Sequence, residues 1–138
     1  MSDEANLLSQ VQEVSHKYPI YGMMLGYFPD IEFIRYAKAV IKQVAIEYGI
    51  NYREVQALVQ AKSKYNPFYF RMLGSINARD DVETLIEWGL TGIKAFEARK
   101  VGFDSKYVTI LLEPELNILY YCKYKATILR CVDEIRGP

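Results

Sequence analysis

The spacing of apolar residues along the chain predicts mostly helices. From Asp30 to Tyr48 they recur at intervals of three and four, the period of one helix face, and Asp30 stands in the N-cap position. A second amphipathic segment follows Asn51, whose side chain suits an N-cap. Its apolar seam consists of Val55, Leu58 and Val59. Gly49, between the segments, is the residue type that most readily takes the left-handed conformation ending a helix. The pattern therefore predicts two helices joined by a tight corner.

Similar patterns predict three further helices. One runs from about Ser2 to His16, and another from about Asp80 to Arg99. The last runs from Glu115 to about Ile135, with Pro114 before it in the first helical position, which proline favours. The β-branched run from Tyr107 to Leu112 fits either a strand or a short helix.

Length and composition agree with this architecture. The chain has 138 residues, of which 51% are apolar and 25% charged, as in an ordinary soluble globular domain with a sizeable core. We therefore expect an all-α fold, with about five helices in one compact domain over residues 1–138. No stretch approaches the roughly 18 apolar residues of a membrane span. The acidic N-terminus, MSDEANLL, is unlike a signal peptide. The expected location is the cytoplasm or a particle assembled there.

The helical corner resembles the helix-turn-helix family of DNA-binding motifs. That family favours a small residue four before the turn glycine, a branched residue just after it and another six after it, which Ala45, Ile50 and Val55 match. The similarity covers about 20 of the 138 residues. The same pattern would suit a purely structural corner packed on a core.

The resemblance implies which side chains would touch nucleic acid. The family reads base edges with residues at the start of its second helix. The corresponding residues here are Asn51, Tyr52, Arg53, Gln56 and Gln60. Phosphate contacts would come from Lys42, Lys62 and Lys64. The segment after Lys64 allows two short strands around Gly74 and Ser75, similar to the wing of a winged helix, or an aromatic loop that caps the core.

The overall charge does not favour strong non-specific binding to nucleic acid. Lys plus Arg and Asp plus Glu number 17 each, so the formal net charge is zero. From Asp30 to Ser75, however, seven basic residues face four acidic ones. The basic ones are Arg35, Lys38, Lys42, Arg53, Lys62, Lys64 and Arg71. This local excess permits a basic face around the corner.

Catalytic and metal-binding patterns do not stand out. His16 is the single histidine, so neither a zinc site nor a ferritin-like carboxylate site is expected, and we predict no cofactor and no enzymatic activity. Cys122 and Cys131 lie nine residues apart on one predicted helix, or about 13 Å, which is beyond disulfide reach. Both are expected to be free, buried thiols.

The runner-up function is that of a non-enzymatic assembly protein, such as a virion component or a subunit of a larger complex. The segment from Tyr18 to Pro29 is almost wholly apolar, with methionines and aromatic residues that suit either a buried linker or an adaptable docking surface. The C-terminal helix is apolar on more than one face. Both segments predict a homo-oligomer, and a helix-turn-helix protein would also be a dimer.

Overall fold

The computed structural model describes residues 29–136 and contains five α-helices, one 3₁₀ helix and three short strands within that range. The elements in chain order are α3 (Ile31–Glu47), α4 (Tyr52–Lys62), β1 (Phe70–Met72), α5 (Arg79–Thr84), β2 (Ile86–Trp88), β3 (Ile93–Lys94), α6 (Ala95–Arg99), the 3₁₀ helix η1 (Val108–Leu112) and α7 (Pro114–Arg136). The predicted first helix, His16 and nearly all of the segment from Tyr18 to Pro29 lie outside the described residues.

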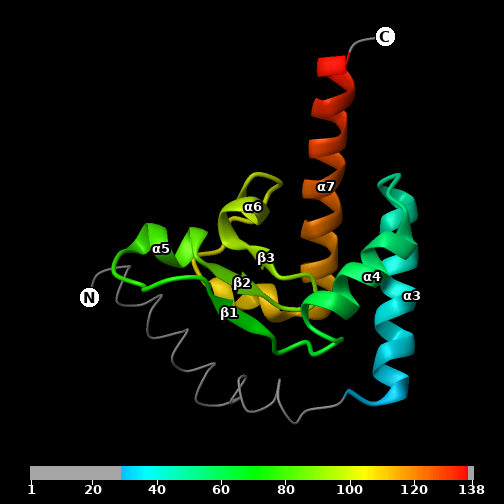
Figure 1. The fold of residues 1–138 in the computed structure, drawn as a ribbon, viewed down its shortest axis with the longest axis horizontal. Helices are drawn as coiled ribbons and strands as arrows, with labels where there is room; N and C mark the ends of the chain where they lie inside the picture. The colour runs from blue at the N-terminus through cyan, green and yellow to red at the C-terminus, as the bar shows by residue number, and fades with distance from the viewer. Residues whose placement is uncertain (1–28, 137–138) are drawn as a thin grey trace.

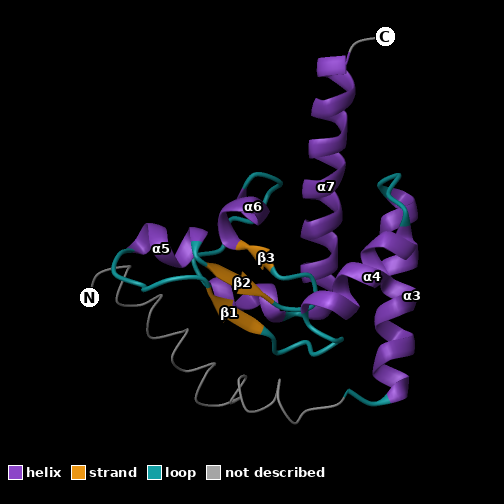
Figure 2. Cartoon of the chain, viewed as in Figure 1, coloured by secondary structure: helices purple, strands orange, loops and turns teal. Residues whose placement is uncertain are grey.

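The long helices form one side of the molecule and the sheet the other. Helices α3 and α7 run side by side in the same direction, and α4 turns back from the end of α3 and packs against it (Figure 1). The sheet has the order β1-β2-β3 and is antiparallel throughout. It lies between α4 and α7 at one side and α5 and α6 at the other (Figure 2). The second half of α7 extends past the other elements (Figure 1).

Two groups of buried side chains hold these layers together. One group joins α3, α4 and α7 and includes Ile41, Val59 and Ile118. The other joins the sheet to α6 and η1 and centres on Trp88. Tyr121 of α7 packs against both groups. Helix α7 is therefore the element that connects the helical corner to the sheet.

Asn117 of α7 links three elements through its buried amide. Its Nδ2 donates to the carbonyl oxygens of Trp88 and Leu111, each at 2.7 Å. Its Oδ1 accepts from the Thr91 backbone N–H at 2.9 Å and from the Thr91 hydroxyl at 2.7 Å. Since a buried polar group is costly unless it is hydrogen-bonded, this fully bonded amide fixes the turn after β2 and the end of η1 against α7.

The structure confirms the predicted helical corner and the mainly helical character of the fold. The Asp30 carboxylate caps α3 by accepting from the Phe33 N–H at 2.8 Å, and Asn51 caps α4. Pro114 is the first residue of α7, as its ring geometry favours. The segment from Tyr107 to Leu112, which fits either a strand or a short helix by its sequence, contains the 3₁₀ helix η1, with Tyr107 in the position before it.

One prediction about the middle of the chain is wrong, and the strand pairing after residue 64 differs from the one that the sequence allows. Residues 80–99 do not form one helix, because Gly89 and Gly92 take positive φ angles of 68° and 69° that break it into a buried hairpin between α5 and α6. The partner of β1 is β2, with Phe70 opposite Trp88, and not the residues just after Gly74 and Ser75. The fold of the described residues is therefore mainly helical, as the pattern predicts, with a small antiparallel sheet whose first strand follows residue 64.

Candidate nucleic-acid interface

The corner between α3 and α4 is held by a left-handed glycine, a helix cap and buried apolar side chains. Gly49 has a φ of 71°, and the next residue, Ile50, donates its N–H to the Ala45 carbonyl at 2.8 Å. The Asn51 side chain then accepts from the Arg53 N–H at 3.0 Å, which satisfies one free donor at the start of α4. Ala45, Ile50 and Val55 are all buried. The apolar positions that carry the resemblance therefore hold the two helices together.

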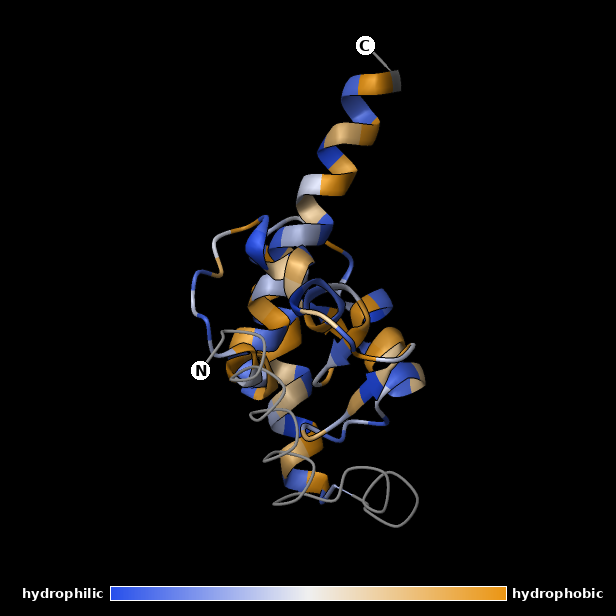
Figure 3. Cartoon of the chain, turned by 90° about the vertical axis from the view of Figure 1, so that its left-hand side faces the viewer, coloured by the Kyte–Doolittle hydropathy of each residue, from blue (hydrophilic) through white to orange (hydrophobic). Residues whose placement is uncertain are grey.

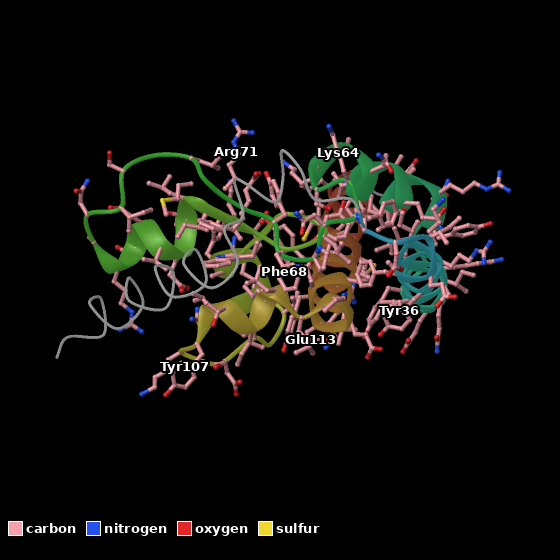
Figure 4. All side chains as sticks on the ribbon, turned by 90° about the horizontal axis from the view of Figure 1, so that it is seen from below. Tyr36, Lys64, Phe68, Arg71, Tyr107 and Glu113 are labelled. Atoms are coloured by element: carbon pink, nitrogen blue, oxygen red, sulfur yellow. The ribbon has the colours of Figure 1, made fainter. Side chains whose placement is uncertain are left out.

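The face of α4 opposite this core is open to solvent. Arg53, Ala57 and Gln60 are exposed, and their spacing places them along one side of the helix axis. Lys64 follows the last turn with a φ of 53° and points away from the body of the protein (Figure 4). A polar, partly basic stripe with a small residue at its centre thus runs the length of α4.

Tyr52, at the start of α4, lies between two cations. The Lys42 Nζ is 5.2 Å from the centre of its ring, and the guanidinium carbon of Arg53 is 5.9 Å away. A hydrogen bond from Arg53 is the main cause that lowers the pKa of Tyr52, followed by the charge of Lys42. Both effects show a positive potential where α3 and α4 meet.

Two of the predicted contact residues lie off the exposed stripe. The Gln56 Nε2 donates to the Lys38 carbonyl at 3.3 Å and so ties α4 to α3. Lys62 points to the sheet, where its Nζ is 2.8 Å from Glu87 Oε2 in a partly buried ion pair. The other six predicted residues are Asn51, Tyr52, Arg53, Gln60, Lys42 and Lys64, and the structure places them on or beside the exposed side of the corner.

Two further cations, which the sequence indicates only as part of the local basic excess, lie at this surface. Lys38 is exposed on α3 with its Nζ 5.9 Å from the ring centre of Tyr65, and it stands one turn before Lys42. Arg71 is exposed on β1 and projects from the same edge of the molecule as Lys64 (Figure 4). The i, i+4 spacing of Lys38 and Lys42 was visible in the sequence, whereas Arg71 reaches this edge only through the sheet. We call Lys38, Lys42, Tyr52, Arg53, Gln60 and Lys64 the corner surface.

Metal-binding clusters and membrane-spanning helices are both absent from the described part of the chain. Within residues 29–136, no group of three or more histidine, cysteine, aspartate or glutamate residues is placed to hold a metal ion. None of the helices in that range is long and apolar enough to cross a bilayer.

Comparison of the chain with protein-family models, with curated proteins and with solved structures found no match.

Proposed function

We propose that this protein binds double-stranded DNA through the corner surface, with α4 as the helix that enters the major groove. The observation that carries the proposal is the exposed side of α4, which presents Arg53 and Gln60 to solvent while its opposite side is buried. A major groove accepts one α-helix and is read by side chains on its outer face. Arg53 and Gln60 are suited to guanine and adenine edges respectively.

The cations around α4 would set the position of the protein on the duplex. Lys38, Lys42 and Lys64 border α4 and have flexible ammonium groups of the kind that contact phosphate oxygens. Arg71 on β1 extends the positive charge beyond the end of α4, in the role expected of a wing residue. Because the protein as a whole has no net charge, affinity depends on this local excess and should fall steeply with salt.

A gel shift with duplex DNA of mixed sequence tests the proposal. We expect the wild type to retard the duplex at about 50 mM salt. Arg53→Ala combined with Gln60→Ala should weaken binding about thirtyfold, because each side chain is expected to contribute on the order of 1 kcal/mol through base contacts. Thermal unfolding should be unchanged, since both side chains are exposed.

The matched control replaces one arginine and one glutamine that lie outside the corner surface. Arg130 on α7 and Gln43 on α3 are also exposed, and neither belongs to the corner surface. Arg130→Ala with Gln43→Ala should therefore leave the gel shift close to wild type. The proposal fails if the wild type retards no duplex at low salt, or if the control pair weakens binding as much as the test pair.

A second candidate function, self-assembly, has its own support in α7. The part of α7 that extends past the other elements contains apolar residues interspersed with polar ones (Figure 3). Ile128, Val132 and Ile135 share one side of the helix and are exposed, with Ile135 at 85%. We call these three residues the α7 stripe. An exposed apolar seam of this length is typical of helix pairing, and a second copy of α7 is the partner proposed for it.

Assembly through α7 predicts a dimer that one charge disrupts. Val132→Glu places a carboxylate within the α7 stripe and should convert a wild-type dimer to monomer in light scattering. Arg130→Glu, on the opposite side of the same helix, should remain dimeric. Mild oxidation should also link two copies through Cys131, which is exposed beside the stripe, and not through Cys122, which is buried. A wild type that stays monomeric at high concentration would exclude this candidate.

A further inference from the structure

A second surface of α4 opens into a cleft on the sheet side of the molecule. The cleft has a volume of about 270 Å³ and lies between Lys62 of α4, the turn that carries Gly92, and one side of α7. It is separate from the corner surface, because Lys62 leaves α4 on a different side from Arg53 and Gln60. Its size approaches the lower end of typical small-ligand pockets.

The floor of the cleft is fixed by an ion pair. Glu87 is almost fully buried, and its two carboxylate oxygens accept from the Tyr69 hydroxyl at 2.9 Å and from Lys62 Nζ at 2.8 Å. Burial, reinforced by the hydrogen bond to Glu87, raises the pKa of Tyr69 and so favours the protonated phenol that donates to Glu87. Lys62 and Tyr69 together therefore satisfy the charge of Glu87 within the protein.

Two further ammonium groups border the cleft from different walls. Lys94 is the last residue of β3 and Lys125 lies on α7. Neither forms an ion pair with any residue of the described range. The carboxylate nearest in sequence is that of Glu97, whose Oε1 accepts from the Lys94 backbone N–H at 2.9 Å and so caps α6. With three lysines against two bonded glutamates, the lining has an excess of positive charge that suits an anion.

The α7 wall adds aromatic surface to this charge. Tyr121 and Tyr124 line the cleft one turn apart from Lys125 and Ile128, and both tyrosines are only partly buried. A tyrosine ring packs well against another flat ring, while lysine ammonium groups bind phosphate as point charges. Aromatic rings next to unpaired lysines are the combination with which proteins hold a nucleotide.

We propose that this cleft binds a single nucleotide, with its phosphate between Lys94 and Lys125 and its base against Tyr121 and Tyr124. The nucleotide has two sources with the same chemistry, a free mononucleotide or one unit of a single-stranded nucleic acid. The proposal does not depend on duplex binding, because none of the corner surface residues lines the cleft.

Calorimetric titration of the full chain with AMP at low salt tests the cleft. Lys94→Gln with Lys125→Gln should weaken AMP binding at least about tenfold, because two charge-assisted contacts to phosphate are lost. Lys100→Gln with Lys106→Gln removes the same charge from exposed positions outside the cleft and should bind AMP like the wild type. Tyr124→Leu should weaken AMP binding and leave the weaker binding of inorganic phosphate unchanged.

Further arms of the titration separate the possible outcomes. A short single-stranded oligonucleotide is the second probe. The cleft is assigned to single-stranded nucleic acid if this probe competes with AMP. The same assignment follows if the probe binds where AMP does not, and loses binding in the variant with both Lys94→Gln and Lys125→Gln. Absence of binding by both probes overturns the proposal, as does inorganic phosphate that binds as tightly as AMP. Equal loss in the control pair would show a general effect of charge and would also overturn it. Arg53→Ala with Gln60→Ala should keep AMP binding, so failure of the duplex proposal is distinguishable from failure of this one.

Discussion

Replacing Gly89 by alanine should lower the free energy of unfolding by about 4 kcal/mol, as measured by urea denaturation. Gly89 has a φ of 68°, which alone costs an alanine roughly 1–2 kcal/mol. A Cβ at this position would also lie 2.3 Å from Asn117 Nδ2 and 2.9 Å from the Leu111 carbonyl oxygen. The Asn117 amide would then have to leave its four partners, so that buried carbonyl and N–H groups lose their hydrogen bonds.

Gly49 provides the matched control for this substitution. Its φ of 71° is nearly the same, but nothing lies within 4 Å of a Cβ built there. Gly49→Ala should therefore cost about 1 kcal/mol, the backbone contribution alone. The difference between the two variants measures the Asn117 network separately from backbone strain. Equal losses in both would mean that the contacts of Gly89 with α7 and η1 contribute nothing to stability.

These two glycines also show which parts of the fold could be predicted from the sequence. Gly49 is flanked by two segments with a clear helical period, so its role at a corner follows from local chemistry. Gly89 stands among residues that also fit a helical period, and its conformation depends on Asn117, which lies 28 positions further along the chain. The hairpin therefore depends on a long-range contact that no local pattern records.

The residues of the candidate interface also differ in how well the sequence predicts their exposure. Asn51 and Arg53 were predictable as exposed because the seam of α4 defines the side opposite to them. Gln56 lies near the border between buried and exposed positions, and Lys62 continues the apolar seam of Leu58 and Val59, so that neighbouring elements decide what each side chain contacts. Gln56 meets α3 and Lys62 meets the sheet, and the sequence gives no direct sign of either contact.

Helix α4 therefore has two polar surfaces with different surroundings. Arg53 and Gln60 project into solvent, while Lys62 is held in place by Glu87 and by the close backbone of Gly92, where a Cβ would come within 2.8 Å of Lys62 Cγ. The fixed lysine anchors α4 to the sheet, and the free residues remain available to a ligand. A change in the ion pair between Lys62 and Glu87 should therefore change the orientation of α4 relative to the sheet, and with it the position of the exposed residues.

Replacing Lys62 by methionine should lower the free energy of unfolding by about 3 kcal/mol, because the nearly buried Glu87 carboxylate keeps only its bond from Tyr69. This value is the lower end of the range for broken buried pairs, since the side chain of Lys62 is 30% exposed and that of Glu87 10%. Lys64→Met removes the same charge from an exposed position nearby and should change stability by less than about 0.5 kcal/mol. Lys62→Met combined with Glu87→Gln should regain most of the loss, because an uncharged amide no longer needs a cation and its oxygen can still accept from Tyr69. A Lys62→Met variant as stable as Lys64→Met in urea denaturation would show that the ion pair does not hold α4 to the sheet.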